Sequence, residues 1–318
     1  MRRQGMVCVV FAVVVALVGC SSPSGGGGGG GPLPVNYNIT AAAPYLLQPN
    51  TPPAGANGSC RPTAAHPRPV ILVHGTVATM GENWAVLSPL LKNNGYCVFA
   101  FNYGGTWLST LTFGNVQGLD GSISAANELR AFVDHVLWAT GATKVDIVGH
   151  SQGGMLPNYY VKFLGGASKV HSIVGLAPVN HGTTLSGLVT LGQDVSRVFP
   201  PLMPFINLFL GLGVPAFVDL QVGSAFMNQL ASLPDTVPGI NYTVIATQYD
   251  QVVTPYQSSF LTGPNVDNIT LQSVCNLDYA EHVAIVFDHI ALRLVLNALD
   301  PSTAVTPVCS PVYAFIGG

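Results

Sequence analysis

The chain carries little charge, and this scarcity limits the partners that it can bind. Of its 318 residues, 11 are lysine or arginine and 14 are aspartate or glutamate, which gives a formal net charge of −3. Arg2 and Arg3 form the one cluster of basic residues, whereas a nucleic-acid-binding domain needs a basic patch or stripe. We therefore exclude nucleic acid as a partner.

Long hydrophobic runs are also scarce, although 48% of the residues are hydrophobic. Residues 7–19 form an uncharged apolar run, but a helix needs about 20 such residues to span a bilayer. The rest of the chain is therefore predicted to form a soluble domain. It has enough apolar material for one large core, or for one core and a cap.

The first 19 residues have the pattern of an export signal. Arg2 and Arg3 precede the apolar run, and a small-residue site follows it. Residues 17–20 read Leu-Val-Gly-Cys, which resembles a bacterial lipobox, a signal in which the cysteine becomes the lipidated first residue of the mature protein. Cys20 is the predicted lipidation site, and the alternative is an ordinary secretory signal with a chance cysteine.

A flexible tether is predicted after this cysteine. Residues 25–31 are seven consecutive glycines, and such a tract does not pack. We expect a signal peptide over 1–19 and a lipidated, Gly/Pro-rich tether over 20–60. The expected location is the cell envelope, held through a lipid anchor on Cys20, with release outside the cell as the alternative.

Four cysteines remain outside the signal and the predicted lipidation site, and an even number in an exported chain suggests two disulfides. Three pairings exist. We favour Cys60–Cys97 and Cys275–Cys309, because each would join neighbouring parts of the chain. The cysteines lack close spacing and the histidines are scattered, so we predict no metal site and no other cofactor.

From residue 61 onward, short apolar runs alternate with helical patterns. Near-continuous apolar strands that alternate with helices predict a parallel sheet covered by helices on both faces. The predicted strands are 69–73, 97–101, 144–148, 170–176, 242–246 and 269–273, and the main predicted helices are 83–93, 124–139, 155–164 and 283–299.

A G-x-S-x-G motif directly follows the third predicted strand, where residues 149–153 read Gly-His-Ser-Gln-Gly. In this motif the serine occupies a sharp strand-to-helix turn that raises its hydroxyl above the sheet. The glycines let the strand and the helix approach without Cβ clashes. The helix N-terminus favours developing negative charge. Because a helix is predicted after the motif, we identify Ser151 as a candidate nucleophile.

A serine hydroxyl is a weak nucleophile, so it needs a base and an acid that orients the base. The chain order expected here is serine, acid, histidine, and four histidines follow Ser151. His171 opens a strand, His181 precedes any suitable acid, and His289 lies within a helical run. His282 lies between a loop and that run, so it is the predicted base.

The predicted acid is Asp250, which follows the strand at 242–246. Loops at the carboxyl ends of parallel strands form the active-site crevice of open α/β sheets. Asp267 and Asp278 are rivals with a less clear strand context, and would otherwise be solvated loop acids.

Two backbone N–H groups are expected to form an oxyanion hole. The first belongs to Gln152, directly after the candidate nucleophile. The second belongs to the loop after the first predicted strand, where we favour Thr76. His74 in the same loop is predicted to be structural.

Four segments together resemble the bacterial secreted lipases called lipase class 2. Their sequences are Val-Ile-Leu-Val-His-Gly-Thr at 70–76, Gly-Tyr-Cys-Val-Phe-Ala at 95–100, Gly-His-Ser-Gln-Gly-Gly at 149–154 and Ala-Pro-Val-Asn-His-Gly-Thr at 177–183. The resemblance covers the chain from about Arg61 to its end. It implies an α/β-hydrolase fold over 61–318, with a mostly parallel central sheet and helices on both faces. It also implies hydrolysis of triacylglycerols or other acyl esters without a metal.

The same resemblance supports Ser151, Asp250 and His282 as a catalytic triad, with Thr76 and Gln152 as oxyanion donors. It also supports the Cys60–Cys97 disulfide. The lipobox and the glycine tract are not typical of secreted members of that family.

Residues 184–233 are predicted to form an apolar cap or lid inserted between two core strands. Residues 199–215 are apolar, broken by prolines and glycines, and without a continuous amphipathic period; the alternative is a buried surface helix pair. The expected partner is a lipid or another ester at an interface, bound by a monomer. A polyester depolymerase, an acyltransferase and a non-catalytic lipid-binding lipoprotein are the alternative functions.

Overall fold

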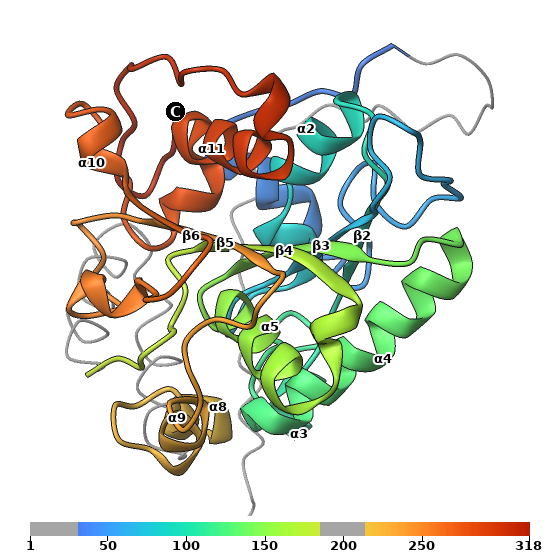
Figure 1. Cartoon of the computed structure of the whole chain (residues 1–318). Coiled ribbons are helices and arrows are strands. Elements are labelled where there is room, and N and C mark those ends of the chain that lie inside the picture. The colour runs from blue at the N-terminus through green and yellow to red at the C-terminus, as the bar shows by residue number, and fades with distance from the viewer. Residues whose placement is uncertain (1–30, 185–213) are drawn as a thin grey trace, which may run out of the picture. The chain divides into compact units, whose positions relative to one another are not determined.

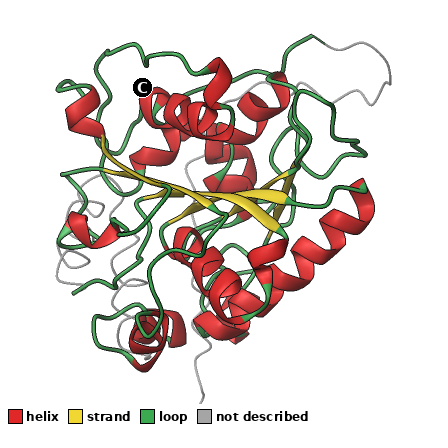
Figure 2. Ribbon diagram, viewed as in Figure 1, coloured by secondary structure: helices red, strands yellow, loops and turns green. Residues whose placement is uncertain are grey.

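The computed structural model describes residues 31–184 and 214–318. These residues form a six-stranded sheet with helices on both faces (Figures 1 and 2). All neighbouring strands are parallel, in the order β2-β1-β3-β4-β5-β6, so the predicted α/β class is confirmed. The strands are β1 (Val70–Val73), β2 (Val98–Phe101), β3 (Val145–His150), β4 (Val170–Leu176), β5 (Asn241–Ala246) and β6 (Val266–Thr270).

Two hydrophobic cores lie on opposite faces of the sheet, and β1 shows why. Its four residues are all buried, and successive side chains of a strand point to opposite faces. Val70 and Leu72 join the core beneath α2 (Leu87–Asn93) and α11 (His289–Leu299). Ile71 and Val73 join the core beneath α4 (Ser122–Thr140) and α5 (Gln152–Phe163).

Shorter elements connect these layers. The short α-helices are α1 (Met80–Asn83), α3 (Trp107–Leu111), α8 (Pro215–Asp219), α9 (Ala225–Leu230) and α10 (Leu271–Val274). The 3-10 helices are η1 (Ile39–Tyr45), η2 (Gly166–Ser168), η4 (Tyr256–Ser259), η5 (Ala284–Phe287) and η6 (Pro301–Thr303). Across the described ranges, none of the helices combines the length and the apolar character needed to cross a membrane.

Three predicted elements differ from the structure. The strand predicted at 269–273 is wrong, because β6 ends at Thr270 and α10 follows. None of the residues of this edge strand is fully buried, so it lacks the apolar run that marks a buried strand. The helix predicted at 283–299 is broken at Asp288, whose carboxylate accepts the N–H of Ile290 and begins α11. The helix predicted at 83–93 is two helices, α1 and α2, and a capping box between Thr79 and Glu82 starts the first.

Part of the segment predicted as a tether, residues 20–60, is packed on the domain. The described residues from Pro32 onward belong to one compact unit. Ala42 in η1 is buried in the core, and the Asn57 side chain pairs with both the N–H and the carbonyl of Ala100, at 2.9 and 2.8 Å. These contacts join residues far apart in the chain, which composition alone does not reveal. The predicted signal, Cys20 and most of the glycine tract lie outside the described residues.

Both predicted disulfides are present. Cys60 and Cys97 have Cα atoms 5.6 Å apart, and Cys275 and Cys309 have Cα atoms 5.2 Å apart. The first bond joins Cys60, at the end of the predicted tether, to the residue before β2. The second joins the end of α10 to the C-terminal segment. Because disulfides persist in oxidising compartments, they fit an exported protein.

The C-terminal part of the predicted lid packs on the domain. Val214 and Ala216 are buried against Leu108 and Leu119. Phe226 in α9 joins the core that α4 and α5 cover. Residues 185–213, which include most of the apolar run, lie outside the described residues, so the lid itself stays a prediction.

Candidate active site

The chain turns sharply between β3 and α5, and Ser151 occupies the turn. β3 ends at His150 and α5 begins at Gln152, while Ser151 has φ 56° and ψ −124°. A positive φ is strained for a residue with a side chain and persists only where the surroundings enforce it. The turn places Ser151 at the carboxyl end of the sheet and at the N-terminus of α5.

Two glycines enforce this turn by close packing. A Cβ on Gly149 would lie 2.0 Å from the carbonyl oxygen of Gly153, and a Cβ on Gly153 would lie 2.2 Å from the carbonyl oxygen of His74. Neither position has room for a side chain. The G-x-S-x-G pattern therefore reflects the contact of the strand with α5, and of α5 with the loop after β1.

The structure brings Ser151, His282 and Asp250 into one chain of hydrogen bonds. The Ser151 hydroxyl lies 3.0 Å from Nε2 of His282, and Nδ1 of His282 lies 2.9 Å from Oδ2 of Asp250. All three residues are buried. The other oxygen of Asp250 accepts the N–H groups of Val252 and Val253, each at 2.8 Å, so the carboxylate faces His282 in a fixed orientation. This is the geometry that the predicted catalytic roles require.

The surroundings of His282 favour its protonated form. Burial alone would lower its pKa, but the charge and hydrogen bond of Asp250, together with the charge of Glu281, raise the pKa above its ordinary value. A general base must be neutral before it accepts a proton. The rate of attack by Ser151 is therefore expected to increase as the pH rises through the pKa of His282.

His150 and Asn83 contact the backbone of His282 and of the loop after β1. Neither residue was predicted from the sequence to take part in the site. Nε2 of His150 donates to the carbonyl of His282 at 2.9 Å, and its Nδ1 lies 2.9 Å from Oδ1 of Asn83. The same Asn83 oxygen accepts the N–H of Gly75 at 3.1 Å. Burial, then the charge of His282, lowers the pKa of His150 well below its ordinary value. His150 occupies one of the two variable positions of the motif, and Asn83 lies 67 residues away, so neither carries a local signal.

The structure also brings together the two predicted oxyanion donors. The Thr76 hydroxyl donates to the side-chain oxygen of Gln152 at 2.9 Å. Tyr103 donates to the carbonyl of His74 at 2.7 Å and stacks on its ring, which fixes the loop before Thr76. Within residues 31–184 and 214–318, the backbone N–H groups of Thr76 and Gln152 have no acceptor. Both are therefore available to a ligand in the structure as described.

The other three candidate histidines lie apart from Ser151. Nδ1 of His171 lies 2.9 Å from Asp146. His181 contacts the Ser258 carbonyl and Asp235. His289 is the first residue of α11 and contacts the Val308 carbonyl. Their contacts are those of structural residues.

The carboxylate that contacts His282 is that of Asp250, and the two rival acids have other neighbours. Asp267 is in β6, opposite Thr243 of β5. Asp278 accepts the N–H of Ala280 at 2.9 Å and is fully buried. The expectation that Asp278 would be a solvated loop acid is therefore wrong, because the loop before His282 folds inward around it.

Comparisons with known proteins find lipases among the sequences similar to this chain. Two curated triacylglycerol lipases, from Pseudarthrobacter phenanthrenivorans and Burkholderia plantarii, are each 31% identical to the chain over 157 residues. The match covers 46% of this chain but 44% and 40% of the relatives, so the chain spans less than half of their length.

Solved structures show the same fold at low sequence identity. Aspergillus fumigatus lipase B matches with a TM-score of 0.58 and 16% identity, over 91% of this chain and 64% of that one. A mature Bacillus licheniformis lipase matches with a TM-score of 0.53 and 16% identity, over 77% and 96%. The fold is that of the α/β-hydrolases. The family model for lipase (class 2) matches residues 67–294, and the chain therefore belongs to the class 2 lipase family.

Proposed function

We propose that the protein hydrolyses carboxylic esters, and acylglycerols in particular, through an acyl-enzyme formed on Ser151. The hydrogen-bonded chain of Ser151, His282 and Asp250 carries this proposal. Membership of the class 2 lipase family and similarity to triacylglycerol lipases support it.

The proposed reaction is acyl transfer in two steps. Ser151 attacks the ester carbonyl while Nε2 of His282 takes its proton, and Asp250 stabilises the imidazolium that forms. The N–H groups of Thr76 and Gln152 would bind the oxyanion. His282 then returns the proton to the leaving alcohol, and water, activated by the same imidazole, releases the fatty acid and free Ser151.

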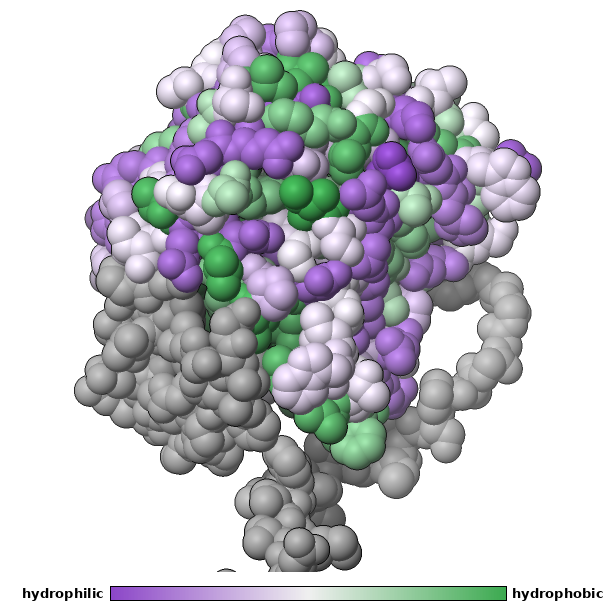
Figure 3. Space-filling model, turned by 90° about the horizontal axis from the view of Figure 1, so that it is seen from below, coloured by the Kyte–Doolittle hydropathy of each residue, from purple (hydrophilic) through white to green (hydrophobic). Residues whose placement is uncertain are grey.

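The surface near α3 supports a lipid as the substrate. The side chains of Trp107, Leu111 and Phe113 are largely exposed, and no charged residue lies between 103 and 119. Figure 3 views the molecule from the side of α3, α8 and α9, and shows apolar residues among polar ones on the described surface. Exposed apolar groups of this kind suit contact with a lipid interface.

A series of substrates tests the proposed function. We expect hydrolysis of p-nitrophenyl esters from short to long acyl chains and release of oleate from emulsified triolein. Hydrolysis of soluble short esters alone would contradict the lipase proposal, although not the esterase chemistry. Clearing of polyester films, or transfer of the acyl group to added alcohols in preference to water, would identify a different enzyme on the same scaffold.

We further propose that the protein is held at the cell envelope by a lipid on Cys20. The Leu-Val-Gly-Cys sequence at 17–20 and the glycine tract after it support this location. The Cys20→Ala variant is expected to leave the membrane fraction or to remain as unprocessed precursor, as immunoblotting of fractionated cells would show. Equal membrane retention of processed wild-type and variant protein would contradict the anchor.

A further inference from the structure

Glu281 precedes the proposed base and is itself buried, with 1% of its surface exposed. Its carboxylate accepts three backbone N–H groups. Oε2 accepts from Val283 at 2.7 Å, and Oε1 accepts from Ala284 at 2.8 Å and from Phe315 at 3.2 Å. The side chain therefore ties the residues directly after His282 to the C-terminal segment.

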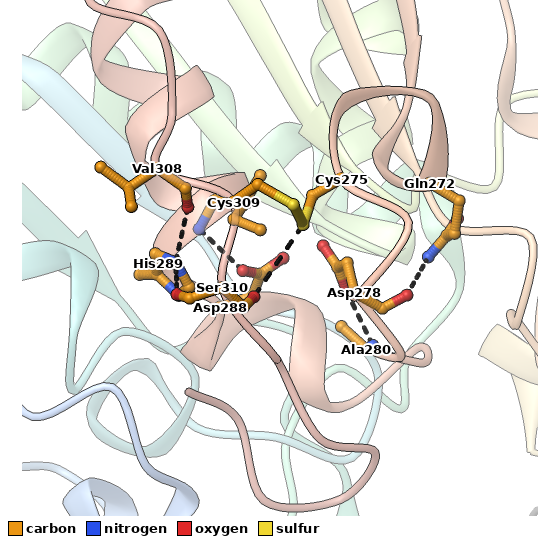
Figure 4. Close-up of a disulfide and its surroundings, with 10 residues drawn as sticks. Gln272, Cys275, Asp278, Ala280, Asp288, His289, Val308, Cys309 and Ser310 are labelled. Atoms are coloured by element: carbon orange, nitrogen blue, oxygen red, sulfur yellow. Dashed lines mark hydrogen bonds between the residues drawn. A yellow bond between two sulfur atoms is a disulfide. The ribbon is translucent and has the colours of Figure 1, made fainter.

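The loop before His282 is fixed by separate contacts. Oδ1 of Asp278 accepts the N–H of Ala280, while Gln272 donates to the carbonyl of Asp278 at 3.1 Å. Figure 4 shows these bonds beside the disulfide between Cys275 and Cys309. The Thr247 hydroxyl also donates to the Ala280 carbonyl at 2.6 Å. The backbone on the N-terminal side of His282 is thus held without Glu281, which acts on the other side.

A neutral amide could not replace this carboxylate without loss. Burying a charge is costly unless hydrogen bonds compensate it, and here three N–H groups point at two oxygens. A glutamine has one acceptor oxygen, so its NH2 group would face a backbone N–H. The site is built for a carboxylate, which lies next to the residue that must become positively charged during the reaction.

The charged and titratable groups around His282 come from three places. Asp250, after β5, contacts the ring directly. His150, at the end of β3, is buried, and burial lowers its pKa. Glu281 is the third. Burial raises its own pKa, against the backbone N–H groups of Val283, Ala284 and Phe315, which favour the carboxylate. Where it is ionised, its charge acts in the same direction as that of Asp250 and raises the pKa of His282.

We propose that Glu281 is a positioning residue for His282: it fixes the backbone that follows the imidazole and supplies a second negative charge that stabilises the imidazolium. This inference rests on the proposed function, because the imidazolium forms when Ser151 gives up its proton. The hydrogen bonds of the Glu281 carboxylate go to the backbone N–H groups of Val283, Ala284 and Phe315, so it acts through His282.

The Glu281→Gln variant tests both parts of the inference. Removing the charge is expected to lower the pKa of His282, so the acid limb of the kcat/KM profile on a short p-nitrophenyl ester moves to lower pH by about 0.5 unit. The plateau kcat is expected to fall by about tenfold, because the imidazolium loses stabilisation and the loop loses a bond. Asp250→Asn removes the carboxylate in direct contact and should move the limb further.

A control variant shows whether the effect depends on the position of Glu281 or follows from the loss of any carboxylate charge. The Glu128 carboxylate also accepts a backbone N–H, from Gly104 at 3.1 Å, and Glu128→Gln should leave the profile unchanged. Loss of kcat and thermal stability in Glu281→Gln with an unmoved acid limb would reduce Glu281 to a structural residue and overturn the proposal. Unchanged kcat and an unchanged limb would overturn it as well.

Failure of the proposed function would be visible separately. A wild-type protein that hydrolyses no ester and takes up no fluorophosphonate label would refute the esterase proposal. NMR titration of the His282 ring in wild-type and Glu281→Gln protein would then still decide whether Glu281 raises the pKa of that ring. Equal midpoints would overturn the inference, and a lower midpoint in the variant would support it.

Discussion

Replacing Ser151 by alanine is expected to lower kcat/KM for ester hydrolysis by about 10⁴-fold or more, because it removes the hydroxyl that lies 3.0 Å from Nε2 of His282 and that would form the acyl-enzyme. Backbone donors and substrate binding survive the change and account for the residual rate. The substitution removes one oxygen and one hydrogen bond, so we expect the free energy of unfolding to fall by about 1 kcal/mol at most.

The measurement combines kinetics, labelling and thermal unfolding. The Ser151→Ala variant should give no label with a fluorophosphonate probe and a Tm within a few degrees of wild type. Ser88→Ala is a suitable control, since it removes a buried hydroxyl with one hydrogen bond, to the Ala54 carbonyl at 2.8 Å, and should keep full activity. Residual activity within about 100-fold of wild type would show that another residue is the nucleophile.

The inner part of the sheet was predictable because burial imposes a simple sequence pattern. A parallel strand covered on both faces must be apolar along its whole length, and β1, β3 and most of β4 are buried. The turn at Ser151 was predictable for a similar reason, because its close contacts admit only glycine at 149 and 153. Both signals are local in sequence.

The supports of the site were not predictable, because they join residues that are far apart. The contact between His150 and Asn83 spans 67 positions, and that between Glu281 and Phe315 spans 34. Nothing in the neighbouring sequence distinguishes these residues from ordinary polar ones. Their partners become evident only once the loops after β1 and before α11 are placed beside β3.

The predictions of helix and strand ends were wrong where polar side chains, rather than a repeating apolar pattern, determine where an element begins or ends. Asp288 lies within an apolar, helical run, yet its carboxylate caps α11 and ends η5. In the same way, β6 is an edge strand without a fully buried residue, and its exposed Asp267 and Asn268 resemble a loop. Capping and edge exposure depend on tertiary surroundings, so periodicity alone places these boundaries poorly.

Replacing Gly153 by alanine is expected to destabilise the fold by about 3 kcal/mol or more and to abolish activity. The new Cβ would lie 2.2 Å from the His74 carbonyl oxygen and 2.3 Å from that of Val73. Both partners are backbone atoms at the end of β1, which rotation of a side chain cannot move aside. Overpacking of this kind costs about 1–3 kcal/mol even where neighbours yield, and here α5 must shift away from the loop that bears Thr76.

The test is decisive because crowding and helix propensity predict changes of opposite sign in the free energy of unfolding. In a helix interior alanine is favoured over glycine by about 1 kcal/mol, so an uncrowded Gly153 would be stabilised by the change. Gly58→Ala is the control, since a Cβ there meets nothing within 4 Å, and it should leave Tm and kcat/KM unchanged. Chemical denaturation gives the free energy of unfolding for both variants. A Gly153→Ala variant as stable and active as wild type would mean that α5 does not approach β1 as closely as the turn at Ser151 requires.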